Sequence, residues 1–268
     1  DVYKRQEVDY YKKLFQTIGN IIVLIEKDDI PKYLLFLENA FPYMDNYNYH
    51  KGMNGIIQEL TGLLKTKNIG TDSDRALLLD FQATLETKPE KAIKLEKDAL
   101  AQIENITADN ARLVSNLHAN LGGLYRMNGH PDLAREHMEK SISLLDQFNL
   151  LHINDSIPQI ANYAMFLTEQ QEPERGISEL QKLSGIIKEY HSDDCLDYAK
   201  VQETLGTIYL MTANLPQAKT HFKRAFKIYE KIWADEPEMI EAKYQEIQEL
   251  YPQIGFCIGK NLSGLLTK

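Results

Sequence analysis

The seven histidines and two cysteines of this 268-residue chain are the side chains best suited to metal binding or nucleophilic catalysis. No histidine lies in an HExxH pattern, and His130 and His137 have no third ligand at helical spacing. Cys195 follows His191 by four residues, but the acidic residues around it disfavour a thiolate nucleophile. The histidines beside the apolar positions, His118 and His221, are expected to flank the core or lie at the surface. The sequence therefore predicts no metal site, no cofactor and no cysteine nucleophile.

Acidic residues outnumber basic ones by 39 to 30, which leaves a net charge of −9 and argues against nucleic-acid binding. Part of the excess lies between Glu230 and Tyr251, which we interpret as a solvated helix face rather than a docking surface for a basic partner. Paired carboxylates for acid–base catalysis need a cleft with unequal environments, which a solenoid rarely encloses. The sequence also lacks GxSxG, SxxK and phosphate-loop patterns. We therefore predict that the chain is not an enzyme and has no catalytic residues.

The elements that carry these side chains follow a period of 42 residues, the mark of a repeat protein. Small residues recur at Gly122, Ala164 and Gly206, and another small residue follows each of them twelve positions later. Asp80 stands one period earlier, where this series requires a small residue. Larger apolar residues keep the same interval in two further series, Tyr125, Leu167 and Tyr209, and Met138, Leu180 and Phe222.

Each period is predicted to form two antiparallel helices. Apolar residues at steps of three and four predict helices over residues 110–127 and 216–233. The short joins at residues 128–131 and 214–216 place a proline near the start of the second helix, which suits a tight hairpin. Gly122 and Gly206 then lie where two helices pack closely, rather than in a phosphate-binding loop. Because one hairpin cannot bury both its faces, the predicted fold is an all-α solenoid of stacked hairpins.

The sequence suggests three segments. The repeats with the 42-residue period occupy residues 73–251, and residues 252–268 are expected to form a C-terminal capping helix. Residues 1–72 form an N-terminal helical segment with helices expected near 7–27, 31–45 and 48–66. This segment is either a degenerate repeat with a leading helix, which we favour, or a small bundle that docks on the solenoid.

Two stretches resemble tetratricopeptide repeats. They are Asn120–Tyr125 followed by Gly129 and Ala134, and Leu205–Tyr209 followed by Ala218. The period exceeds the family's usual length of about 34 residues. The tail Tyr229–Pro237 is similar to the longer repeat of kinesin light chains and of bacterial multidomain sensors such as nucleotide-binding signalling ATPases. The resemblance implies a right-handed superhelix that binds a protein or peptide segment.

In proteins of this kind the first helix of each hairpin lines the concave face, so the resemblance implies that exposed polar residues there bind the partner. Asn120 and Asn162 lie one period apart, and an amide can both donate to and accept from a peptide backbone. The alternative is that these amides hydrogen-bond neighbouring hairpins. The other predicted binding residues are Asn116, Arg126, Thr168, Glu169, Lys200, Glu203 and Thr207.

The sequence favours a protein- or peptide-binding module, and three settings stay open. In the first it is the sensor part of a larger bacterial signalling protein, which the missing start methionine favours. The second is a peptide-pheromone receptor, and the third is a scaffold that self-associates. Two distant cysteines and the lack of a secretory segment predict a cytoplasmic location. No nucleic-acid or membrane partner is expected, whereas a homo-oligomer or an attached upstream domain remains open.

Overall fold

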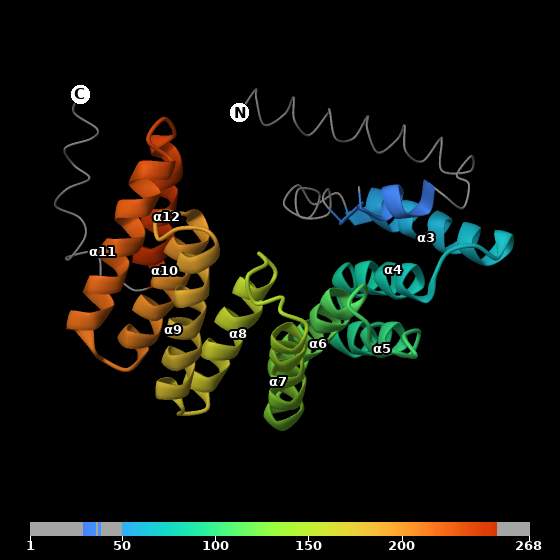
Figure 1. Ribbon diagram of the computed structural model, residues 1–268, viewed down its shortest axis with the longest axis horizontal. Coiled ribbons are helices and arrows are strands. Elements are labelled where there is room, and N and C mark those ends of the chain that lie inside the picture. Colours follow the sequence, from blue (N-terminus) through green and yellow to red (C-terminus); the bar gives the residue numbers. More distant parts are fainter. Residues whose placement is uncertain (1–28, 36, 39–49, 251–268) are drawn as a thin grey trace. The chain divides into compact units, whose positions relative to one another are not determined.

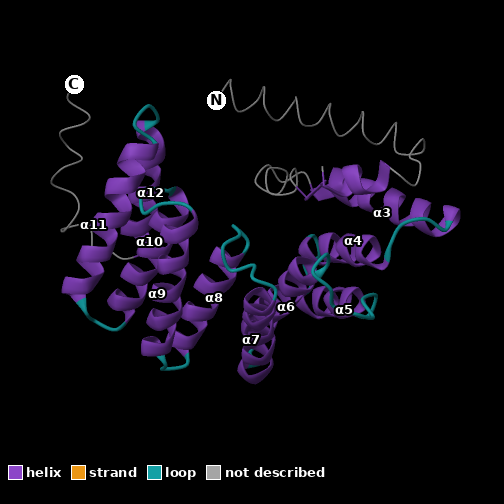
Figure 2. Cartoon of the chain, in the orientation of Figure 1, coloured by secondary structure: helices purple, strands orange, loops and turns teal. Residues whose placement is uncertain are grey.

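The computed structural model describes residues 29–35, 37–38 and 50–250, and within these ranges the chain forms helices and loops without a strand (Figures 1 and 2). Contacts divide the chain into two compact units, Asp1–Leu144 and Leu145–Lys268. None of the helices in the described ranges is long and apolar enough to cross a membrane.

The described helices of the first unit are α3 (His50–Lys67), α4 (Asp72–Thr84), α5 (Pro89–Leu100), α6 (Ala111–Met127) and most of α7 (Pro131–Gln147). Helix α4 begins with a capping box, in which the Thr71 hydroxyl accepts from the Asp74 amide and the Asp74 carboxylate accepts from the Thr71 amide. Helix α4 packs against α3, α5 and α6, and α5 also packs against α6. The first unit is therefore a stack in which successive hairpins touch.

The second unit consists of α8 (Ser156–Glu169), α9 (Pro173–Tyr190), α10 (Leu196–Met211), α11 (Leu215–Ile232) and α12 (Pro237–Leu250). Helices α8 and α9 form one hairpin, α10 and α11 form the next, and the first helices α8 and α10 also contact each other (Figure 1). The predicted helices at 110–127 and 216–233 are confirmed as α6 and α11 to within one residue at either end. The fold class is the predicted one, an all-α solenoid of stacked antiparallel hairpins.

The turns within the α6–α7, α8–α9 and α10–α11 hairpins share a left-handed middle residue. Gly129, Gln171 and Ala213 are spaced by one period, and each is the middle residue of a three-residue turn. Their φ angles are 74°, 65° and 59°, all in the left-handed region that favours glycine. A glutamine and an alanine accept this conformation at the two later positions, so packing of the helices and not residue preference determines the turn.

The small residues of the 42-residue series lie at close helix contacts, as predicted. A Cβ atom on Gly122 would lie 2.6 Å from Cγ of Met138, and one on Gly206 would lie 2.8 Å from the Phe222 ring. A Cβ atom on Gly176 would lie 2.6 Å from the carbonyl oxygen of Ala164, which belongs to the backbone. The hairpins therefore close to distances that leave no room for a side chain at these glycines.

The described part of the N-terminal segment packs onto α4. Ile30, Leu34 and Leu37 share a buried cluster with α3 and with Leu78 and Phe81 of α4. The cluster contains residues from the described parts of two expected helices. The expected helix 48–66 corresponds to α3, and residues 31–35 and 37–38 belong to the expected helix 31–45. The expected helix 7–27 and the capping helix 252–268 lie outside the described residues.

Candidate functional site

All nine predicted binding residues lie on the first helices of hairpins, in two sets. Helix α6 of the first unit carries Asn116, Asn120 and Arg126. Helices α8 and α10 of the second unit, which pack together, carry Asn162, Thr168, Glu169, Lys200, Glu203 and Thr207. The structure therefore brings six of the nine residues onto one pair of neighbouring helices.

The two period-related asparagines have different environments. Asn120 donates from Nδ2 to Oδ1 of Asp80 on α4, at 2.8 Å, so it bonds the neighbouring hairpin as the alternative interpretation expected. Asn162 is exposed, and its side chain makes no hydrogen bond to the described part of the chain. Its amide is therefore available to an external partner, whereas that of Asn120 is partly committed to the fold.

The remaining residues on α8 and α10 differ in their exposure and in the hydrogen bonds and ion pairs that their side chains make. The Thr168 hydroxyl donates to the Ala164 carbonyl at 2.9 Å, and the Thr207 hydroxyl donates to the Glu203 carbonyl at 3.1 Å. Glu169 and Lys200 are exposed, and Nζ of Lys200 lies 3.5 Å from the Asp197 carboxylate of the same helix. Asn162, Glu169 and Lys200 together are called the α8/α10 polar surface below.

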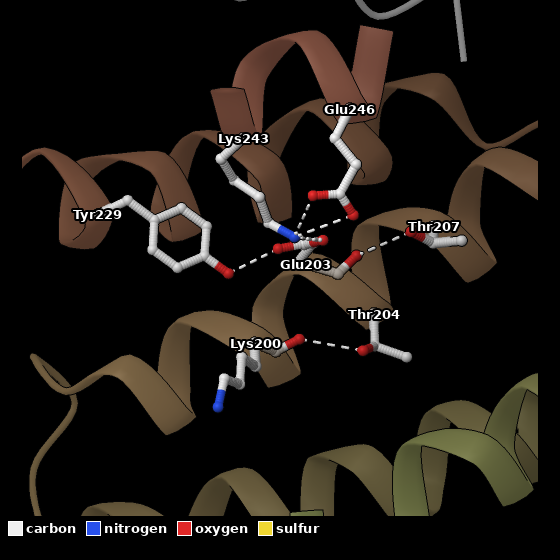
Figure 3. A network of polar contacts seen from close by, with 7 residues as sticks. All are labelled: Lys200, Glu203, Thr204, Thr207, Tyr229, Lys243 and Glu246. Carbon is white, nitrogen blue, oxygen red and sulfur yellow. Dashed lines mark hydrogen bonds and ion pairs between the residues drawn. The ribbon is translucent and has the colours of Figure 1, made fainter. Parts of the chain in front are cut away.

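Glu203, another predicted binding residue, lies in a network that joins three helices (Figure 3). Its Oε2 accepts from the Tyr229 hydroxyl of α11 at 2.5 Å, and its Oε1 lies 2.9 Å from Nζ of Lys243 on α12. Lys243 also contacts Glu246 at 3.1 Å. The Glu203 and Lys243 side chains are only 18% and 22% exposed. The Glu203 carboxylate is therefore occupied by contacts that attach α12 to the preceding hairpin.

The charges of this network are held in fixed states. Burial first, and then the Glu203 carboxylate, raise the pKa of the Tyr229 hydroxyl, which stays a donor. Burial opposes the charge of Lys243, but its bonds to Glu203 and Glu246 outweigh burial and raise its pKa. A neutral donor and a cation therefore face Glu203 throughout the physiological pH range.

Replacing Tyr229 by phenylalanine is expected to destabilise the second unit by about 1–2 kcal/mol, because the half-buried carboxylate of Glu203 loses a donor. The chain's one tryptophan, Trp233, stacks on Tyr229 at 4.8 Å between ring centroids, so its fluorescence during urea unfolding reports on this unit. Tyr209→Phe is the control, because it keeps its ring stacking on His221. Equal unfolding midpoints for the two variants would contradict a stabilising role of the Glu203 network.

A pair of carboxyl groups, the half-buried Asp80 and the buried Glu96, lies in the first unit, where the sequence predicted none. Asp80 on α4 and Glu96 on α5 hydrogen-bond each other, and Glu96 is only 1% exposed. One oxygen of Glu96, Oε2, is buried and has no hydrogen-bond partner among the residues that the structure describes. The sequence places Asp80 in the small-residue series. Its partner Glu96 lies one period before Met138, in the series of large apolar residues. The signal for the pair in the sequence is a glutamate at position 96, where the later repeats have the apolar residues Met138, Leu180 and Phe222.

Two histidines occupy equivalent positions in hairpins 84 residues apart. His137 stacks on Tyr125 and lies 2.9 Å, Nδ1 to Nδ1, from His118, while His221 stacks on Tyr209 and lies 2.9 Å from Oε1 of Gln202. Burial, followed by the neighbouring His137, lowers the pKa of His118 to about 4. His118 and His221 are half-buried beside the core, in agreement with the expectation that they flank it, and each is hydrogen-bonded across its hairpin. In the described ranges no group of three His, Cys, Asp or Glu side chains could hold a metal ion.

Four helices of the second unit, α8 to α11, match a known family model. Residues 156–231, from the start of α8 to the end of α11, match the tetratricopeptide repeat. The predicted resemblance is confirmed for this segment. Repeats of this family generally mediate protein–protein interaction, and their fold is generally a non-catalytic interaction module. No curated protein is similar enough in sequence to count as a match.

Solved structures are similar in fold to most of the chain. BtubC (BKLC) from P. vanneervenii is 16% identical with a TM-score of 0.56, over 88% of this chain and 92% of that one. A putative kinesin light chain from Podosopora anserina with nearly identical TPR-like repeats matches in two structures. One of them has a TM-score of 0.61 at 13% identity, over 78% and 99% of the two chains. The other has a TM-score of 0.57 at 14% identity, over 73% and 93%. At these identities the likeness is one of fold.

Proposed function

We propose that the chain binds a protein or peptide segment along α8 and α10, through the α8/α10 polar surface. The observation that carries the proposal is the exposed, unbonded amide of Asn162 on the first helix of a hairpin inside the tetratricopeptide match. The amide of Asn162 can donate to a backbone carbonyl and accept from a backbone amide, which is the pattern that an extended peptide presents.

The charges of the surface favour a partner of mixed polarity. Glu169 ends α8 with an exposed carboxylate, and Lys200 presents an exposed ammonium group on α10. Exposed charges of both signs steer and orient a partner more than they add affinity. In this proposal the asparagine supplies backbone recognition, and the two charged residues determine the direction in which the segment lies.

The proposal is tested with peptides selected from a random library against the immobilised chain, with binding then measured by fluorescence anisotropy. Asn162→Ala is expected to weaken the selected peptides about 5- to 30-fold, which corresponds to the loss of about 1–2 kcal/mol of hydrogen bonding. The unfolding midpoint should stay unchanged, because the side chain is exposed and unbonded. Ser178→Ala, at an exposed position on the second helix α9, is the matched control.

Two outcomes would count against this surface. Asn162→Ala with unchanged affinity for every selected peptide would remove the asparagine from the site. Peptides that lose affinity with Ser178→Ala but not with Asn162→Ala would move the binding surface to the second helices.

The proposal extends to a sensing role within a larger signalling protein, without catalysis in this region. It is supported by the resemblance of the repeats to those of bacterial multidomain sensors, and by the non-catalytic character of most tetratricopeptide modules. Reading the whole gene tests this part, because a sensor predicts an output domain in the same reading frame. A reading frame that encodes only these repeats would contradict it.

A further inference from the structure

The contact between α4 and α5 differs in chemistry from the equivalent contacts of the later hairpins. In those hairpins a small residue on the first helix faces a large apolar residue on the second, as Gly122 faces Met138. In the α4–α5 hairpin the same two positions hold Asp80 and Glu96. A carboxyl pair, with Glu96 fully buried and Asp80 half-buried, thus replaces an apolar contact in this hairpin.

The surroundings of the pair supply few compensating charges. Asn120 of α6 donates a hydrogen bond to Asp80. The Glu38 carboxylate of the N-terminal segment repels the negative charge of Asp80. Arg112 of α6 is paired with Glu38. Lys97, next to Glu96 on α5, lies over the Tyr125 ring instead. On its other side α4 packs through the apolar Leu78 and Phe81 against α3.

Two carboxylates in contact cannot both ionise in such a site without strong repulsion. We infer that the Asp80–Glu96 pair is a proton-controlled latch, which holds α4 and α5 together more tightly when protonated and loosens their contact as it loses protons. A carboxyl group that keeps its proton can donate to its partner, whereas a second negative charge is stabilised, within the described part of the chain, by the Asn120 amide.

The direction of the effect follows from the two carboxyl groups. Burial raises the pKa of Asp80 to about 6, and burial together with the Asp80 charge raises the pKa of Glu96 further. Between pH 5 and pH 8 the folded pair therefore holds more protons than the same groups in the unfolded chain. The stability that they contribute is present in full below their ordinary pKa values and is lost as pH rises. Acidification thus tightens the hairpin, whereas most proteins lose carboxylate-dependent stability in acid.

Hydrogen exchange of the full chain, read by mass spectrometry on peptides from α4 and α5, tests this inference. After correction for intrinsic rates, protection of the α5 amides is expected to be at least about tenfold higher at pH 5 than at pH 8. His118 and His137 respond to pH in the opposite direction between α6 and α7, so the readout is confined to α4 and α5. The α8–α9 hairpin, which has Ala164 and Leu180 at the equivalent positions, is the internal reference.

Variants separate the latch from a general effect of pH. Glu96→Gln is expected to reduce the ratio of protection at the two pH values to below about threefold, while Glu90→Gln, at an exposed position on the same helix, leaves it unchanged. Asp80→Asn provides a second test on the other helix and should act like Glu96→Gln. The inference is overturned if the wild-type ratio equals that of the α8–α9 hairpin, or if both pair variants keep the wild-type ratio.

Discussion

Gly176→Ala is expected to lower the free energy of unfolding of the second unit by about 1–3 kcal/mol, although alanine is the better helix former. The added methyl carbon would lie 2.6 Å from the Ala164 carbonyl oxygen and 3.2 Å from its carbonyl carbon. Both are backbone atoms of α8, so no side chain can rotate out of the way. The two helices must separate, and the buried Leu180 next to this contact loses packing.

Gly185→Ala is the matched control for Gly176→Ala, because it lies on the same helix with nothing within 4 Å of a new Cβ atom. It should stabilise the unit by about 0.5–1 kcal/mol through helix propensity alone. Urea unfolding followed by Trp233 fluorescence measures both variants. If the two variants shift the midpoint in the same direction, the close approach of α8 and α9 is not what requires glycine at position 176.

The double variant Asp80→Ala/Glu96→Leu is expected to stabilise the first unit at pH 8 by about 1–4 kcal/mol. It gives the α4–α5 hairpin the same pair of residues that the α8–α9 hairpin has at Ala164 and Leu180. Replacing buried charged groups with well-packed apolar residues is often neutral or stabilising by this amount. The amide of Asn120 loses its acceptor, but it is exposed and can bond water.

Asp80→Ala alone provides the comparison for the double variant. It leaves Glu96 buried without its carboxyl partner, so it should recover much less stability than the double variant. Hydrogen exchange of α4 and α5 peptides gives the local stability of each variant. A double variant that is less stable than the wild type at pH 8 would show that the two positions are not equivalent to Ala164 and Leu180 in their packing.

The period in the sequence was enough to predict the fold, because each repeated position has one physical task. Gly122, Ala164 and Gly206 recur where helices meet, and Pro131 and Pro173 begin second helices. Local rules of helix formation and close packing therefore predicted both the hairpins and their boundaries. The 42-residue interval also predicted which glycines would tolerate no side chain.

Side-chain partners were harder to predict than positions, because they depend on contacts between hairpins. Asn120 and Asn162 look equivalent in the sequence, but only Asn120 has an aspartate opposite it on the preceding hairpin. Glu203 was predicted to face a partner and instead bonds Tyr229 and Lys243, 26 and 40 positions further on. Periodicity indicates which face of a helix a residue occupies, but not which polar group approaches it from the next helix.

The left-handed turn residues have a consequence for how such a chain can be rearranged. Gly129, Gln171 and Ala213 all have a left-handed φ despite their different side chains, so the turn of the three later hairpins tolerates different residues at its centre. A hairpin can then be regarded as a cassette, a 42-residue unit whose turn keeps the same conformation wherever the unit stands in the chain. Deleting or duplicating one 42-residue cassette, or exchanging two of them, should preserve every turn and require compatible surfaces only where neighbouring cassettes meet. By this logic new specificities could arise in such a chain by shuffling whole hairpins, with no change to the turns inside them.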